Sequence, residues 1–67
     1  MISIQVNGRP VQIDDEMSVE KLLRTVDVPP NYLAVEVNGD VVVREEHDRV
    51  LVREGDQVEV VTLVGGG

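Results

Sequence analysis

The sequence predicts an α+β fold in which a mixed sheet of four to five strands curls around one α-helix. Three observations support this class: short segments alternate apolar and polar residues, two Asn-Gly pairs join such segments, and one stretch has helical spacing. Because one helix can cover only one face of a sheet, a sheet curled around that helix fits these elements best.

The length of 67 residues indicates one small domain with one core. We expect this domain to span residues 1–64 and a flexible glycine tail to span residues 65–67. The chain has no cysteine, so neither a disulfide nor a Cys-ligated metal can stabilise it. Its stability must therefore come from packing of its many Val, Leu and Ile residues.

The charge excludes one large class of partner. Thirteen acidic and six basic residues give a formal net charge of -7, which repels nucleic-acid phosphates, and a single aromatic residue offers no platform for base stacking. We therefore expect no nucleic-acid partner.

The N-terminus has no basic segment followed by an apolar stretch, and no apolar run approaches the roughly 18 residues of a membrane span. These features predict no membrane association and a cytoplasmic location.

The chain begins with a predicted hairpin. Ile2, Ile4 and Val6 alternate with polar residues, as in a strand with one buried face. Asn7-Gly8 favours a type I′ turn, because both residues tolerate positive φ, and the alternation resumes after it.

A helix is predicted from Ser18, which can cap its first turn, to about Val26. Pro29 and Pro30 then end it, because proline cannot continue a helix. The spacing i, i+3, i+4, i+7 forms an apolar stripe that we expect to face the sheet. The stripe consists of Val19, Leu22, Leu23 and Val26.

A second hairpin is predicted around Asn38-Gly39, with alternating residues from Leu33 to Val37 before it and a Val run after it. The sequence Val-Asn-Gly thus occurs twice. Because its flanks differ, we interpret it as convergent turn chemistry rather than an internal repeat.

The last third of the chain divides into a connection and a strand. Residues 44–56 are polar and rich in turn residues, which predicts a long connection with little regular structure. Residues 58–64 are densely apolar, which predicts a strand that is covered on both faces and central in the sheet. We expect this strand to lie beside the first strand and parallel to it.

The glycine run Gly65-Gly66-Gly67 departs most clearly from ordinary folding logic. Three glycines add no packing and cost conformational entropy when ordered, so their use must be mobility or thinness, unless they are merely a frayed end. An extended tail of this length reaches roughly 10 Å. It can thread a narrow channel in another protein and deliver there a carboxylate that is ionised at neutral pH.

Other candidate sites are weaker. The run Asp14-Asp15-Glu16 lacks the spacing of a calcium loop and is expected to be a solvated charge run. His47 is the single histidine, and without a second ligand or nucleophile we expect it at the surface. Arg44 follows three valines, and three interpretations stay open: a plain strand-end arginine, an arginine that pairs with one of the many acidic side chains, or a residue that orients a partner loop.

The whole chain resembles the ThiS family, the sulfur carriers of thiamin biosynthesis, which have the ubiquitin-like β-grasp fold. The resemblance is carried by Val-Asn-Gly after the first strand, by Leu-Ala-Val-Glu-Val-Asn-Gly at 33–39, and by Gly-Asp-Gln-Val-Glu-Val-Val at 55–61, which leads to the terminal glycines. Members often have proline before the arginine that matches Arg44 and an aromatic residue shortly after it. This chain has Val43 and His47 there.

The resemblance implies a carrier rather than an enzyme. An E1-like adenylyltransferase would use ATP to adenylate the Gly67 carboxylate, and sulfur from a persulfide donor such as a cysteine desulfurase would then give a C-terminal thiocarboxylate. A thiazole synthase would take that sulfur. No cofactor or metal is expected on the chain itself. Gly65 and Gly66 would enter the partner's site, and an apolar patch near Val60, Leu63 and Val64, with Arg44, is the expected docking surface.

Three other functions remain open at this point. A related carrier can serve molybdopterin, cysteine or another sulfur pathway with the same tail chemistry. A protein modifier would instead end as an isopeptide on lysines of other proteins. A plain interaction module would have an inert tail.

Overall fold

A computed structural model of the protein describes residues 1–26, 28 and 31–62. The elements in chain order are β1 (Ile2–Val6), β2 (Arg9–Ile13), β3 (Met17–Ser18), α1 (Val19–Thr25), β4 (Ala34–Val37), β5 (Asp40–Val42), the short 3₁₀ helix η1 (Arg44–Glu46), β6 (Leu51–Val52) and β7 (Gln57–Val61). The predicted boundary between a domain at 1–64 and a tail at 65–67 stays a prediction, because residues 63–67 lie outside the described residues.

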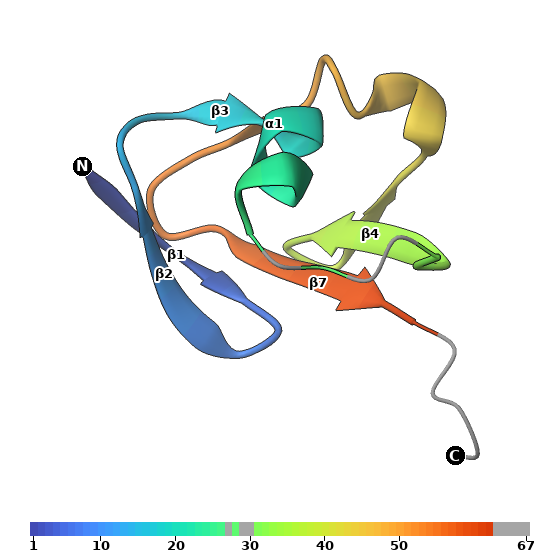
Figure 1. The fold of residues 1–67 in the computed structure, drawn as a ribbon, viewed down its shortest axis with the longest axis horizontal. Coiled ribbons are helices and arrows are strands. Elements are labelled where there is room, and N and C mark those ends of the chain that lie inside the picture. Colours follow the sequence, from blue (N-terminus) through green and yellow to red (C-terminus); the bar gives the residue numbers. More distant parts are fainter. Residues whose placement is uncertain (27, 29–30, 63–67) are drawn as a thin grey trace.

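Five strands form one mixed sheet in the order β2-β1-β7-β4-β5. β1 and β7 run parallel, and the other neighbouring strands run antiparallel. Helix α1 lies over one face of this sheet, as Figure 1 shows. The predicted α+β class with a helix on a mixed sheet is therefore confirmed, as is the parallel pairing of the first and last strands.

Both predicted hairpin turns are present. Asn7 and Gly8 have φ of 51° and 80°, and Asn38 and Gly39 have φ of 53° and 87°. Two successive positive φ values define the type I′ turn, whose twist matches that of the flanking strands. Asparagine and glycine are the residues that adopt this conformation at least cost.

The two turn asparagines also hold β7. Asn7 Oδ1 accepts a hydrogen bond from Val60 N (2.8 Å), and Asn38 Oδ1 accepts one from Gln57 N (2.9 Å). Asn38 Nδ2 also donates to Asp56 Oδ1 (3.0 Å). The interpretation of the two Val-Asn-Gly segments as turn chemistry was thus incomplete, because each asparagine side chain also satisfies a backbone N–H of the central strand.

Replacing Asn7 by glycine is expected to destabilise the fold by about 0.5 to 1.5 kcal/mol, the net contribution of one hydrogen bond that is only partly buried. Glycine keeps the positive φ of this turn and removes only the acceptor for Val60 N. Asn7→Asp is the matched control, since it keeps an acceptor oxygen and also tolerates positive φ. Urea denaturation gives the free energy of unfolding of each variant. If Asn7→Gly and Asn7→Asp have equal free energies of unfolding, the role given to the Asn7 side chain is contradicted.

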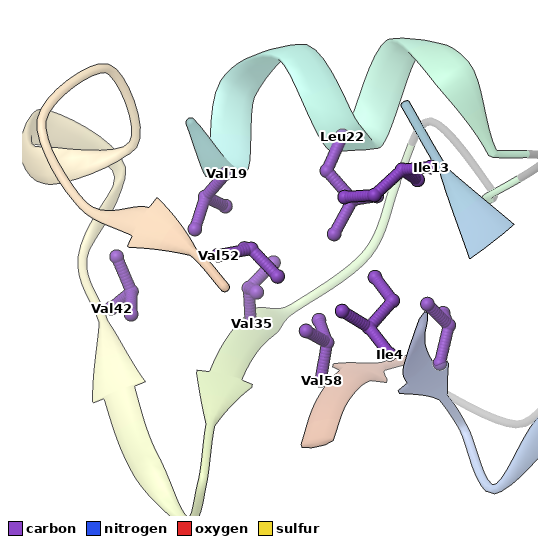
Figure 2. Close-up of a cluster of buried hydrophobic side chains, with 9 residues drawn as sticks. Ile4, Ile13, Val19, Leu22, Val35, Val42, Val52 and Val58 are labelled. Carbon is purple, nitrogen blue, oxygen red and sulfur yellow. The ribbon is translucent and has the colours of Figure 1, made fainter. Parts of the chain in front are cut away.

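The core lies between α1 and the inner face of the sheet. Val19 and Leu22 are fully buried, and in Figure 2 their side chains point from the helix toward those of the strands. Leu23 and Val26 pack against the core only partly buried, at the edge of the predicted stripe. The buried cluster consists of Ile4, Val6, Ile13, Val19, Leu22, Val35, Val42, Val52 and Val58.

The helix boundaries agree with the prediction to within one residue. Ser18 caps the first turn, since its Oγ accepts a hydrogen bond from Lys21 N (3.1 Å). At the other end, Val26 N donates to the Leu22 carbonyl (2.9 Å) from an extended conformation. Pro29 and Pro30, which were expected to end the helix, lie outside the described residues.

The prediction that the last strand is covered on both faces was wrong. β7 is central in the sheet, as predicted, but its residues alternate: Val58 and Val60 are buried, whereas Gln57, Glu59 and Val61 are exposed. Helix α1 covers only one face of the sheet, so the opposite side chains of a central strand stay in contact with solvent. Leu63 and Val64, which were assigned to this strand, lie outside the described residues.

The connection at 44–56 contains more regular structure than was predicted. It begins with η1, and its β6 pairs antiparallel with β3 in a second, two-stranded sheet. It also receives the first backbone donors of α1, because Val19 N donates to the Val50 carbonyl and Glu20 N to the His47 carbonyl, each at 2.9 Å. These contacts satisfy N–H groups that a helix leaves without internal partners.

Candidate functional site

The candidate site is the end of β7, where the chain leaves the sheet toward its glycines. Gly65, Gly66 and Gly67 lie outside the described residues, so their place can be given only by what precedes them. Val61 is the last residue of β7, and its carbonyl accepts a hydrogen bond from Leu33 N (2.7 Å). The last residue of β7 therefore lies in the central strand of the sheet, beside the first residue of β4.

The predicted docking patch needs a correction at Val60. This side chain is only 6% exposed and belongs to the interior, whereas its neighbour Val61 is 37% exposed on the opposite face. Strand geometry sends successive side chains to opposite faces, so only one of two adjacent valines can face a partner. The other two members of that patch, Leu63 and Val64, lie outside the described residues.

Exposed apolar side chains do gather at this end of the sheet. Leu33, Val41 and Val43 are 61%, 60% and 49% exposed, and we call these three residues the apolar patch. A hollow of about 280 Å³ includes all three in its lining, whereas Val61 is exposed on β7 but does not line the same hollow. Alternation applied strictly from Val58 onward would have found Val61, but the exposure of Leu33 depends on where β4 begins.

Arg44 borders the same hollow and is held by Tyr32. Its Nη1 donates to the Tyr32 hydroxyl (3.3 Å), its Nη2 donates to the Tyr32 carbonyl (3.2 Å), and its guanidinium lies 4.5 Å from the centre of the Tyr32 ring. No ion pair to Arg44 occurs within residues 1–26, 28 and 31–62. Arg44 thus holds the segment before β4, and its side chain is exposed.

The prediction of a surface histidine was wrong, because His47 is only 7% exposed. Its ring stacks on Tyr32 with centroids 6.1 Å apart. Nε2 donates to the Val42 carbonyl (3.2 Å), since a carbonyl only accepts, and Nδ1 lies within hydrogen-bond distance of the Tyr32 hydroxyl (3.4 Å). The charged neighbours Glu46 and Asp48 gave a misleading signal, because both are exposed whereas His47, which follows η1, is buried.

The remaining acidic and histidine side chains do not form a metal site in the part of the chain that the structure describes. Asp14, Asp15 and Glu16 are all exposed, as expected for a solvated charge run. Among the same residues, no helix is long and apolar enough to cross a membrane.

Comparison with known proteins identifies the family. The ThiS family matches residues 4–67 of the chain, a range that includes the terminal glycines. The chain belongs to the ThiS family. A crystal structure of the thiamine biosynthesis protein ThiS from Geobacter metallireducens is 38% identical and superposes with a TM-score of 0.83, over 98% of this chain and 100% of that one. The β-grasp fold expected from the resemblance is thereby confirmed.

Two other relatives of this ThiS-family chain differ greatly in length. The uncharacterized protein ycf40 of Porphyra purpurea is 33% identical and is covered over 93% of its length. A thiazole synthase of Magnetococcus marinus is 38% identical over 66 residues, but the chain covers only 20% of that protein. A segment similar to this chain therefore occurs within a longer polypeptide named thiazole synthase.

Proposed function

We propose that the chain is a sulfur carrier of thiamin biosynthesis and that the carboxylate of Gly67 receives the sulfur. The observation that carries this proposal is the ThiS-family match, which extends to residue 67. The relative named thiazole synthase supports the pathway, because it joins a similar segment to the kind of enzyme that would consume the sulfur. In this proposal the chain is a co-substrate rather than an enzyme.

The proposed chemistry begins with activation by a separate E1-like adenylyltransferase. The Gly67 carboxylate attacks the α-phosphate of ATP, pyrophosphate leaves, and an acyl adenylate forms. The terminal sulfur of a protein persulfide, supplied by a cysteine desulfurase, then attacks the acyl carbon, and AMP leaves. A thiol cleaves the resulting acyl disulfide, is itself oxidised to a disulfide, and releases the thiocarboxylate. ATP is thus used by the partner and is not a cofactor held by this chain.

The thiocarboxylate sulfur is a nucleophile, and a thiazole synthase would incorporate it into the thiamin thiazole ring. The carrier then returns with its Gly67 carboxylate and is used again. None of these steps needs a cysteine on the carrier, and the chain has none. Because activation requires ATP, we propose that the carrier works in the cytoplasm.

The apolar patch supports docking of the activating enzyme. An enzyme that admits the tail must sit against the end of the sheet from which the tail leaves, because the three glycines reach only roughly 10 Å. Leu33, Val43 and Val61 are exposed at that end. Burial of such side chains at the centre of an interface is a common source of affinity. The acidic surface would speed encounter with a basic partner face.

Disrupting the gene in its own organism tests the pathway. We expect growth without thiamin to stop and to resume when the thiazole precursor is supplied. The disruption removes the sulfur supply for thiazole synthesis and leaves the rest of the thiamin pathway intact. A plasmid carrying the full chain should restore growth, and the same plasmid without the Gly67 codon should not. A requirement for molybdopterin or cysteine would instead assign the carrier to one of those pathways.

A further inference from the structure

The second half of β7 has a neighbouring strand on only one side. β4 accompanies it as far as Val61, which pairs with Ala34. β1 pairs only with Gln57 and Val58, and the chain then turns away at Asn7 into β2. Figure 1 shows β7 continuing past that turn with β4 beside it. One edge of the strand that leads to the glycine tail is therefore open.

The hydrogen-bond pattern identifies the backbone groups on this edge. Residues of a strand direct their N–H and C=O groups alternately to its two edges. The Asp56 and Val58 carbonyls accept from Gln5 N (3.0 Å) and Asn7 N (2.9 Å). The even-numbered residues of this segment thus face β1, and Val60 and Thr62 continue the series.

Along this edge of β7, the last backbone group with a hydrogen-bond partner is Val60 N, which donates to the Asn7 side chain (2.8 Å). The next two groups are the Val60 carbonyl and the Thr62 N–H. Neither has a hydrogen-bond partner within the described ranges 1–26, 28 and 31–62. In a parallel ladder these two groups bind the N–H and C=O of a single residue on the neighbouring strand.

The residues after this edge explain why an open edge is useful there. Gly65, Gly66 and Gly67 have no side chains, so a protein that recognises them has only backbone N–H and C=O groups and the terminal carboxylate to bind. Backbone recognition of an extended segment is achieved by adding a strand. A strand added at Val60 and Thr62 would be aligned to continue along the residues that follow.

We propose that the edge of β7 at the Val60 carbonyl and the Thr62 N–H pairs with an extended backbone segment of the activating enzyme. This inference rests on the proposed function, because it assigns the edge to the partner that admits the tail. The enzyme segment takes the place that β1 leaves at Asn7, and it lies parallel to β7. A second copy of the chain is a poorer occupant, since two molecules each with a formal net charge of -7 repel one another.

Thr62→Pro tests the proposal, because proline lacks the N–H and can lie at a strand edge. Thr62→Val is the matched control, since it keeps the N–H and has a similar shape. The affinity of each full-length variant is measured for the adenylyltransferase from the same organism. We expect Thr62→Pro to weaken binding roughly tenfold or more and Thr62→Val to change it little.

Amide hydrogen exchange of the unaltered protein gives a second measurement that does not depend on how the proline variant folds. We expect the Thr62 N–H to exchange fast in the free protein and to be protected in the complex. If the complex forms and sulfur is transferred while Thr62 stays unprotected and both variants bind alike, the edge proposal is wrong and the carrier function stands. If the protein neither binds the enzyme nor accepts sulfur, both fail. Protection that instead grows with the concentration of the protein alone assigns the edge to a second copy.

Discussion

Deleting Gly66 and Gly67 is expected to abolish sulfur acceptance and to leave the melting temperature nearly unchanged. The deletion removes no side chain larger than hydrogen, and every member of the buried cluster lies between Ile4 and Val58. Packing and tail chemistry are therefore separable. The assay incubates each protein with ATP, the activating enzyme and a sulfur donor, and intact mass then reports the replacement of one oxygen by sulfur.

Gly66→Leu separates the thinness of the tail from the presence of its carboxylate. This variant keeps Gly67 and its carboxylate but adds a bulky side chain and restricts the backbone. We expect it to accept no sulfur and to melt like the unaltered protein. Sulfur acquisition by the deletion variant would contradict the role of Gly67, whereas acquisition by Gly66→Leu alone would contradict only the narrow channel.

Leu22→Ala is expected to lower the free energy of unfolding by about 2 to 5 kcal/mol, the range for removing a buried leucine side chain. Leu22 is fully buried and lies between α1 and the strands in Figure 2. A domain of 67 residues is stabilised by only roughly 3 to 10 kcal/mol, so this one change can approach the whole stability.

Leu23→Ala is the matched control for Leu22→Ala, because it removes the same atoms from the next position of the helix. Leu23 is only partly buried, so we expect a smaller loss at this position. Chemical denaturation of both variants gives the comparison. A loss below about 1 kcal/mol for Leu22→Ala, or a larger loss for Leu23→Ala, would show that the helix packs on a different face.

The elements that could be predicted from sequence are those with local signals. Alternation located β1 and β2, and the two Asn-Gly pairs located both hairpins. Ser18 marked the start of the helix. By contrast, β3 and β6 have two residues each, which is too short for any periodicity, and they form because distant parts of the chain meet.

The predictions of side-chain exposure that were wrong also concern positions that depend on contacts between distant parts of the chain. His47 is flanked by charged residues, and only its tertiary partners, Tyr32 and the Val42 carbonyl, account for its burial. The faces of Val60 and Val61 could have been assigned by strict alternation, but the dense apolar run favoured a strand buried on both faces. The open edge of β7 depends on which residues of β1 pair with it, and this register could not be predicted from a single sequence.

The candidate chemistry, unlike the docking surface, followed from the sequence alone. Three terminal glycines after an apolar strand predicted a thin tail that ends in a carboxylate, and the family match includes these residues. The surface that a partner would contact required the structure, because it combines residues from separate strands and from the segment before β4.

The intact mass of the protein purified from its own cells, during growth without thiamin, tests the central claim most directly. We predict a fraction whose mass shows one oxygen replaced by sulfur, and fragmentation that places the sulfur at Gly67. Two results would contradict the account: a spectrum that contains the unmodified mass alone, or conjugates in which Gly67 is joined to lysines of other proteins.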